Sequence, residues 1–298
     1  MNQVLSFKPD TSIIPVVESF YDKQTSTFTY VVKDPQSSSC AIFDAVMDLD
    51  YASGKISYAG AQQIISYVED NKLDVEWIIE THVHADHLSA ASYLKELLGG
   101  KIGIGADIVE VQQVFGEIFN EGDDFKRDGS QFDQLFSEGD SYSIGMMTMH
   151  VLHTPGHTPA CMSYIVGNAA FVGDTLFMPD GGTARTDFPG GNASELYHSI
   201  TRLLTLPKAM RLFMCHDYGG EGREVEYETT VQAQRWGNIH VNDAISVERF
   251  IEMRNARDAT LDMPRLILPS LQVNMRAGNF PLAEDNGRIY LKLPINAF

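Results

Sequence analysis

The sequence is poor in basic residues and in long apolar runs. Its 298 residues include 22 Lys and Arg against 40 Asp and Glu, which leaves a formal net charge of −18. Nucleic acids and anionic membranes bind clustered positive charge, so we expect neither as a partner. No apolar run approaches the roughly 18 residues of a membrane-spanning helix. The N-terminal residues also lack the basic and apolar regions of a secretory signal, so we expect a cytoplasmic protein.

Cysteine is also scarce. The three cysteines, Cys40, Cys161 and Cys215, are far apart, and no two form a CxxC pair. A disulfide framework and a thiolate zinc site are therefore not expected. The remaining composition, 44% apolar and 21% charged residues, is that of an ordinary globular protein long enough to bury a full core.

Short β-branched and aromatic runs alternate with helical spacing along most of the chain. Apolar side chains at positions 61, 64, 65 and 68 predict a helix over 58–70. Residues 115–134 are acidic and contain glycine, which favours a loop or a frayed helix. Strands are predicted at 28–34, 40–46, 75–79, 101–106, 161–166, 169–173 and 211–215, and further helices at 193–205 and 245–257. This order indicates two sheets packed face to face with helices outside.

The chain changes character near residue 236. Beyond that point, one predicted helix is followed by irregular sequence that is rich in Pro and Asn. We therefore expect a catalytic domain at 1–235 and a C-terminal extension at 236–298 that packs on the same domain.

The strongest chemical signal is the segment THVHADH at residues 81–87, which follows a predicted strand and precedes a predicted helix. Every buried imidazole needs a partner, so three histidines and one carboxylate within six residues exceed what a structural role explains. His82 and His84 are two residues apart in an extended segment, so both rings can face one ion. Asp86 and His87, on the turn into the helix, can face a neighbouring position.

Three later residues extend this set. His157 and Asp174 lie on glycine-containing turns after predicted strands, where the backbone can bend toward a cleft, and His216 ends another strand. Five of the nine histidines in the protein belong to the resulting seven candidate ligands. The sequence therefore predicts a metal centre.

The complete HxHxDH motif and the later His, Asp, His order resemble the metallo-β-lactamase fold superfamily over about residues 10–235. The resemblance implies an α+β fold, a four-layer αββα sandwich with the metal site at one edge of the two sheets. Hydrolases of this superfamily use all seven positions to hold two metals, with the residue at Asp174 bridging them.

Two further segments resemble the persulfide dioxygenases, a family close to glyoxalase II. They are TARTDF at 183–188 and the tail PSLQVNMRAG at 269–278. Membership of that family implies a non-haem enzyme that oxidises glutathione persulfide, or a related small persulfide, with O2 and water to sulfite and glutathione. It also implies one Fe(II) per chain, held by His82, His157 and Asp174, with open positions left for substrate and O2.

The same resemblance suggests roles for the other residues. Four would surround the iron ligands or hold a second metal: His84, Asp86, His87 and His216. Asp86 and His87 would take part in catalysis, and Tyr218 matches a tyrosine beside the iron that contacts substrate or oxygen. Arg185 and Arg276 would bind the carboxylates of the substrate, because an acidic protein needs local positive charge to hold an anion.

The residue types leave a second reaction open. A dinuclear hydrolase of thioesters or lactones, similar to hydroxyacylglutathione hydrolase, would use the same seven ligands for two Zn(II). The chain also has Thr183 where some persulfide dioxygenases carry a cysteine, so no role for that thiol applies here. The sequence leaves open the thiol that carries the persulfide, a cooperating sulfurtransferase and a homodimer.

Overall fold

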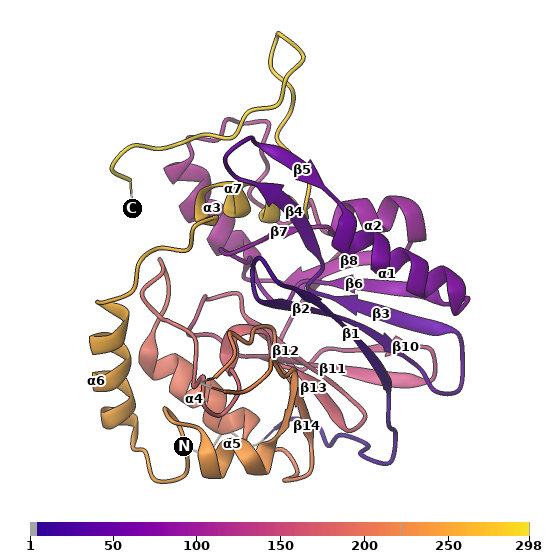
Figure 1. Ribbon diagram of the computed structural model, residues 1–298, viewed down its shortest axis with the longest axis vertical. Helices are drawn as coiled ribbons and strands as arrows, with labels where there is room; N and C mark the ends of the chain where they lie inside the picture. The colour runs from indigo at the N-terminus through magenta and orange to yellow at the C-terminus, as the bar shows by residue number, and fades with distance from the viewer. Residues whose placement is uncertain (1–4, 221, 298) are drawn as a thin grey trace.

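The computed structural model describes residues 5–220 and 222–297, which form four layers (Figure 1). Two six-stranded sheets pack face to face, and helices cover their outer faces. The expected αββα sandwich is confirmed. No helix in the described ranges is both long and apolar enough to cross a membrane.

The two large sheets follow one another along the chain, the first within residues 16–136 and the second within residues 141–230. The first sheet has the order β1 (Val16–Asp22), β2 (Thr27–Lys33), β3 (Ser39–Phe43), β6 (Asp74–Ile79), β8 (Lys101–Gly105) and β9 (Gln134–Phe136). The second has the order β10 (Ser141–Ile144), β11 (Met147–His153), β12 (Met162–Val166), β13 (Ala169–Phe171), β14 (Arg211–Phe213) and β15 (Glu228–Thr230). A small sheet joins β5 (Lys55–Ser57), β4 (Val46–Asp50) and β7 (Leu88–Ser89).

Apolar helix faces cover both large sheets. The outer face of the first sheet is covered by α1 (Ala59–Asp70), α2 (Ala91–Leu98) and α3 (Ile108–Ile118), and α7 (Ile267–Asn274) joins the same apolar cluster and packs on β7. The outer face of the second is covered by α4 (Ala193–Leu203) and α5 (Val231–Gly237), and α6 (Val247–Asp258) packs on α4. The predicted helix over 58–70 is confirmed as α1, and the predicted start of α4 is confirmed by the Asn192 side chain, which accepts a hydrogen bond from the Glu195 N–H at 3.1 Å.

The inter-sheet core is aromatic. Side chains alternate along β2, so Phe28, Tyr30 and Val32 enter this core while Val31 faces the helices on the outer side. Phe171 of the second sheet stacks on Phe43 of the first, with ring centroids 4.5 Å apart. This contact joins the two sheets directly.

Two sequence-based expectations need correction. The loop or frayed helix expected at 115–134 is wrong at its start, because Phe115 belongs to α3 and both Phe115 and Phe119 are buried in the core. The acidic residues around them gave the segment a polar average and hid its apolar face. Helix α7 lies in the tail that was expected to be irregular, and its residues are almost all buried.

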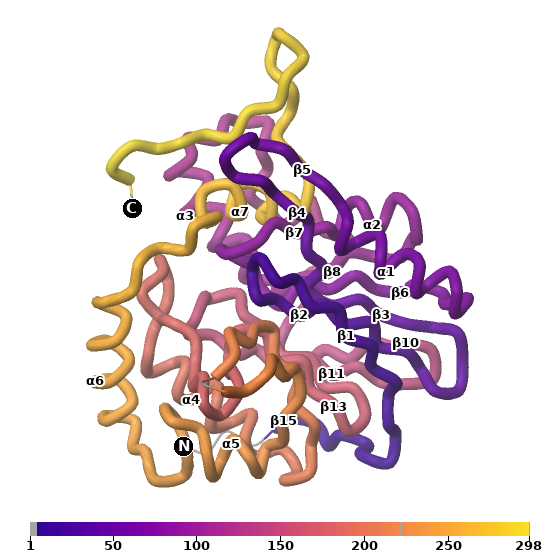
Figure 2. The backbone as a smooth tube through the Cα atoms, in the orientation of Figure 1, coloured from indigo at the N-terminus to yellow at the C-terminus, as the bar shows by residue number. Residues whose placement is uncertain are grey.

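The fold brings strand ends together at one edge of the sandwich. β3 and β6 are parallel neighbours in the first sheet, as are β13 and β14 in the second, so their carboxyl ends lie at common edges. An isolated bridge between Thr27 and His216 joins the two sheets there. The C-terminal extension returns to this body, because α6 packs on α4 and α7 on β7, as the orange and yellow trace of Figure 2 shows.

We expect Phe171→Ala to lower the free energy of unfolding by about 3–5 kcal/mol, because it removes a buried ring from the inter-sheet stack and leaves a cavity. Denaturant unfolding measures the change, and Met146→Ala at an exposed position is the control. A loss below about 1 kcal/mol would contradict this account of the core.

Candidate metal centre

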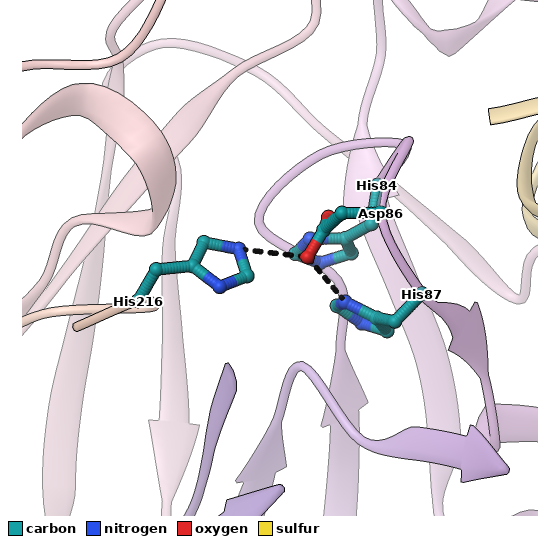
Figure 3. Close-up of side chains that lie close together, drawn as sticks. All are labelled: His84, Asp86, His87 and His216. Atoms are coloured by element: carbon teal, nitrogen blue, oxygen red, sulfur yellow. Dashed lines mark ion pairs between the residues drawn. The ribbon is translucent and has the colours of Figure 1, made fainter. Parts of the chain in front are cut away.

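All seven predicted ligands converge at this edge and form two groups. The donor atoms of His82, His157 and Asp174 lie within 4.8 Å of one another. The same limit holds for the second group, whose members are His84, Asp86, His87 and His216 (Figure 3). The side chains come from the segment after β6, the turns after β11 and β13, and the segment after β14. The structure thus contains a metal-binding site built from His and Asp residues.

Asp174 lies between the two groups. Its Oδ2 is 3.8 Å from Nε2 of His82 and 3.7 Å from Nε2 of His157. Its Oδ1 is 3.3 Å from Nε2 of His216. One carboxylate oxygen therefore faces each group, which is the arrangement that a bridging ligand requires.

Hydrogen bonds fix which nitrogen of each imidazole faces the centre. Nδ1 of His157 donates to the Arg185 carbonyl at 2.8 Å, because a carbonyl can only accept, so Nε2 carries the lone pair. In His84 the order is reversed, since Nε2 donates to Oδ1 of Asp44 at 2.9 Å and leaves the lone pair on Nδ1. Nδ1 of His216 faces the Ser26 carbonyl at 3.3 Å, which leaves Nε2 as the donor toward a metal.

A metal fits this set because the inward atoms have no other partner. Among the described residues, six ligand atoms are buried without a hydrogen-bond partner: His82 Nε2, His84 Nδ1, Asp86 Oδ2, His87 Nε2, Asp174 Oδ1 and His216 Nε2. Buried polar atoms are normally satisfied, and a cation held by the donor atoms of each group would satisfy these. Burial also lowers the pKa of His82 and of His84 well below the ordinary value, which keeps both rings neutral as metal ligands.

Asp44 forms hydrogen bonds with the first part of the THVHADH segment at residues 81–87. The sequence motifs gave no indication of this role. Its Oδ1 accepts from the Thr81 N–H at 2.7 Å as well as from His84, and its Oδ2 accepts from the Thr81 hydroxyl at 3.0 Å. That hydroxyl in turn accepts from Nδ1 of His82 at 3.0 Å. Burial raises the pKa of Asp44 to about 6. Its φ of +52° is a conformation that Asp tolerates better than most residues, which is the one local signal that a sequence could carry.

A pocket of about 700 Å³ opens beside the metal centre. Asp86, His157 and Asp174 line it on the metal side, together with Tyr218, which is exposed. The TARTDF loop at 183–188 forms a second wall, and the chain from the end of α6 to residue 266 forms a third. This volume lies in the range of small-molecule sites.

The two arginines expected to bind substrate lie in different places. Arg185 lines the pocket, but its guanidinium forms a bidentate ion pair with Asp187 and stacks on Phe188. Arg276 does not line it, because its buried guanidinium pairs with Glu121 at 2.8 Å and lies over the ring of Phe125. The substrate-binding role expected for Arg276 does not fit this position.

Other arginines face the pocket instead. Arg257 and Arg265 line it from the C-terminal extension, and both are exposed. They lie 72 and 80 residues after Arg185 in the sequence. Sequence reasoning missed them because only the fold of the extension brings them beside the metal ligands.

The chain is similar to known proteins of one superfamily. A family model described as the metallo-beta-lactamase superfamily matches residues 23–216. A probable metallo-hydrolase of Burkholderia pseudomallei is 52% identical over 291 residues, covering 94% of this chain and 99% of that protein. The mitochondrial persulfide dioxygenase ETHE1 of Bos taurus is 27% identical over 266 residues, covering 88% and 89%. The crystal structure of ETHE1 from Myxococcus xanthus has a TM-score of 0.71 at 28% identity and covers 89% of this chain and 100% of that one.

We expect His157→Ala to weaken metal binding by at least about tenfold, and His84→Ala to weaken it less, if one metal occupies the three-residue group. Metal content after dialysis against a chelator measures the difference. His198→Ala, at an exposed position outside both groups, is the control. Equal loss in both ligand variants would contradict occupation of the three-residue group alone.

Proposed function

The chain belongs to the metallo-β-lactamase superfamily, and we propose that within it the protein is a persulfide dioxygenase that uses one Fe(II). The observation that carries this proposal is the three-residue group of His82, His157 and Asp174 at the wall of a pocket with exposed arginines. Two imidazoles and one carboxylate are the ligand set of non-haem Fe(II) oxygenases, because they leave open coordination positions. The similarity to ETHE1 over most of the chain supports the same reaction.

The reaction consumes one glutathione persulfide, one O2 and one water, and it yields glutathione, sulfite and two protons. Iron(II) in the three-residue group would supply the redox chemistry that joins oxygen to the outer sulfur. Asp86 lines the pocket, and its Oδ2 has no hydrogen-bond partner among the described residues. We assign this oxygen as the acceptor for a proton of the water that enters sulfite. Nδ1 of His87 lies 3.5 Å from the same oxygen, so His87 would take part in this proton transfer.

The remaining pocket residues would bind and orient the substrate. Tyr218 stands at the pocket next to His216, with the two rings parallel and their centroids 6.0 Å apart, so its hydroxyl can donate to the persulfide sulfur or to oxygen. The carboxylates of glutathione would lie against Arg257 and Arg265, whose charges are exposed at the pocket. Arg185 would act mainly through its backbone, since its carbonyl accepts the proton of His157 Nδ1.

A second candidate is a dinuclear zinc hydrolase of thioesters or lactones. The four-residue group favours it, because all four of its inward atoms are buried without a hydrogen-bond partner among the described residues, whereas in the three-residue group Nε2 of His157 is not among such atoms. The name of the Burkholderia pseudomallei relative points to the same class. The two groups would then hold two zinc ions, which would supply an activated water for attack on the substrate carbonyl.

We expect protein purified from iron-supplemented cells to contain about one iron per chain and to take up O2 with glutathione persulfide while sulfite forms. The measurements are elemental analysis, oxygen uptake and hydrolysis of a glutathione thioester on the same sample. Asp174→Asn should lose oxygen uptake, because it changes the carboxylate that contacts both groups. Two zinc ions per chain with thioester cleavage and no oxygen uptake would exclude the dioxygenase.

We expect Arg257→Gln and Arg265→Gln each to raise KM for glutathione persulfide by about tenfold with little change in kcat, because each removes a charged contact far from the reacting sulfur. Steady-state oxygen uptake gives both constants. Arg249→Gln is the matched control, since this exposed arginine is also on α6 but does not line the pocket. Unchanged KM in both pocket variants would rule out this carboxylate site.

A further inference from the structure

We infer that the C-terminal extension is part of the metal centre, because it holds the two segments that carry the ligands. Asn274 holds the HxHxDH loop, and the Arg254–Asp258 pair holds the TARTDF loop that orients His157. These are positioning residues, since the structure places none of them among the seven ligands. They would raise metal affinity by keeping the donor atoms in binding geometry before a metal arrives.

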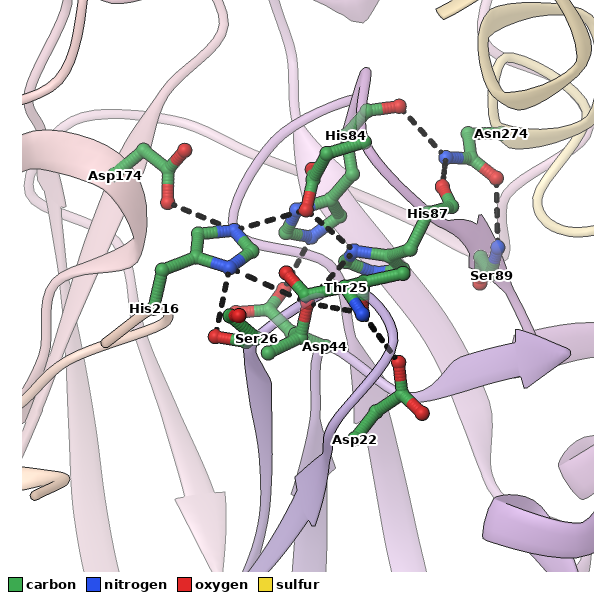
Figure 4. Close-up of polar contacts among 12 residues, drawn as sticks. Asp22, Thr25, Ser26, Asp44, His84, His87, Ser89, Asp174, His216 and Asn274 are labelled. Atoms are coloured by element: carbon green, nitrogen blue, oxygen red, sulfur yellow. Dashed lines mark hydrogen bonds and ion pairs between the residues drawn. The ribbon is translucent and has the colours of Figure 1, made fainter. Parts of the chain in front are cut away.

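Asn274 lies at the end of α7 and contacts the backbone of the HxHxDH loop at two points and that of the adjoining strand β7 at a third (Figure 4). Its side-chain amide donates to the His84 carbonyl at 2.8 Å and to the His87 carbonyl at 2.7 Å. Its Oδ1 accepts from the Ser89 N–H at 2.7 Å. Both amide hydrogens are therefore used on the HxHxDH loop and the amide oxygen on the strand that follows it, 185 or more residues away in sequence.

The loop between β6 and β7 has no regular secondary structure to hold it. Its buried carbonyls need donors, and Asn274, which is itself buried, supplies two of them. The carbonyls belong to the same residues whose rings face the metal, so a shift of this backbone moves Nδ1 of His84 and Nε2 of His87. A fully satisfied buried polar network fixes such positions more strongly than apolar packing does.

A second contact comes from α6. The buried Arg254 donates through Nε to Oδ1 of Asp258 at 2.8 Å and through Nη1 to the Thr183 carbonyl at 2.9 Å. Oδ2 of Asp258 accepts from the Thr186 N–H at 2.8 Å and from its hydroxyl at 3.1 Å. The Arg254–Asp258 ion pair therefore forms hydrogen bonds with the TARTDF loop on both sides of residue 185.

That loop carries the hydrogen-bond partner of a metal ligand. Arg185 lies between Thr183 and Thr186, the two residues that bond to Arg254 and Asp258. Its carbonyl accepts a hydrogen bond from Nδ1 of His157. Helix α6 is thus linked through one loop to the ring of His157. Partners that orient metal-bound histidines in this way typically change metal affinity by about 10–100-fold when they are removed.

The test measures Co(II) binding to the full-length, metal-free protein, without substrate or turnover. We expect Asn274→Ala and Asp258→Asn each to raise the Co(II) dissociation constant by about 10–100-fold in competition with a chromophoric chelator. The visible absorption of the Co(II) protein should also change, because the ligands reorient. Circular dichroism identifies variants that keep the fold, and Asn274→Ser and Thr186→Ala are milder changes for the same two contacts.

Two matched controls lie in the same extension. Asn279→Ala removes an amide that donates to the Arg276 carbonyl and does not contact the HxHxDH loop. Asp243→Asn removes an ion pair with Arg235 on the surface. Both should bind Co(II) like the wild-type protein. A folded Asn274 or Asp258 variant with wild-type affinity and an unchanged Co(II) spectrum would overturn the positioning role of that residue, whichever reaction the enzyme catalyses.

Discussion

Six buried ligand atoms that lack hydrogen-bond partners meet at one edge of the sandwich, and the surrounding structure depends on satisfying them. Burying polar atoms without partners is costly, and a bound cation would offset that cost here. The histidines are turned toward the centre by bonds on their far sides, from Asp44, the Ser26 carbonyl and the Arg185 carbonyl. Orientation from outside leaves the inner nitrogens free for metal.

The groups that hold the ligand residues in place come from the first large sheet and its loops, from the TARTDF loop and from the C-terminal extension. Asp44 follows β3 in the first sheet, and Thr27, at the start of β2, bridges to His216 in the segment after β14. Asn274 and Asp258 reach the same region from the C-terminal extension. The geometry of the metal site therefore depends on tertiary packing, because a shift of any of these elements would displace a ligand atom. The extension belongs to the site physically, although it lies outside the 23–216 match to the family model.

The charge of the exposed arginines at the pocket differs in sign from the net charge of the protein. The net charge of −18 repels anions at long range, yet Arg257 and Arg265 present exposed positive charge at the pocket. Other arginines are neutralised by close partners, as Arg185 is by Asp187 and Arg276 by Glu121. An arginine therefore contributes to anion binding here only if the fold leaves it unpaired at the pocket, and its position in a motif does not decide that.

Much of the fold and of the candidate metal site could be predicted from the sequence. Local patterns suffice where the signal is local: the apolar spacing of α1, the cap at Asn192, and the HxHxDH motif, whose ligand types are dense within a few residues. Helices α3 and α7 escaped detection because their burial depends on distant partners and outweighs their average polarity. Asp44, Asn274 and Arg257 carry no motif, and their roles arise when strands and loops distant in sequence meet at one sheet edge. The sequence by itself determined the fold class and the seven candidate ligands, whereas tertiary structure decided which groups orient those side chains and which charges face the pocket, because hydrogen bonds and ion pairs depend on distance in space.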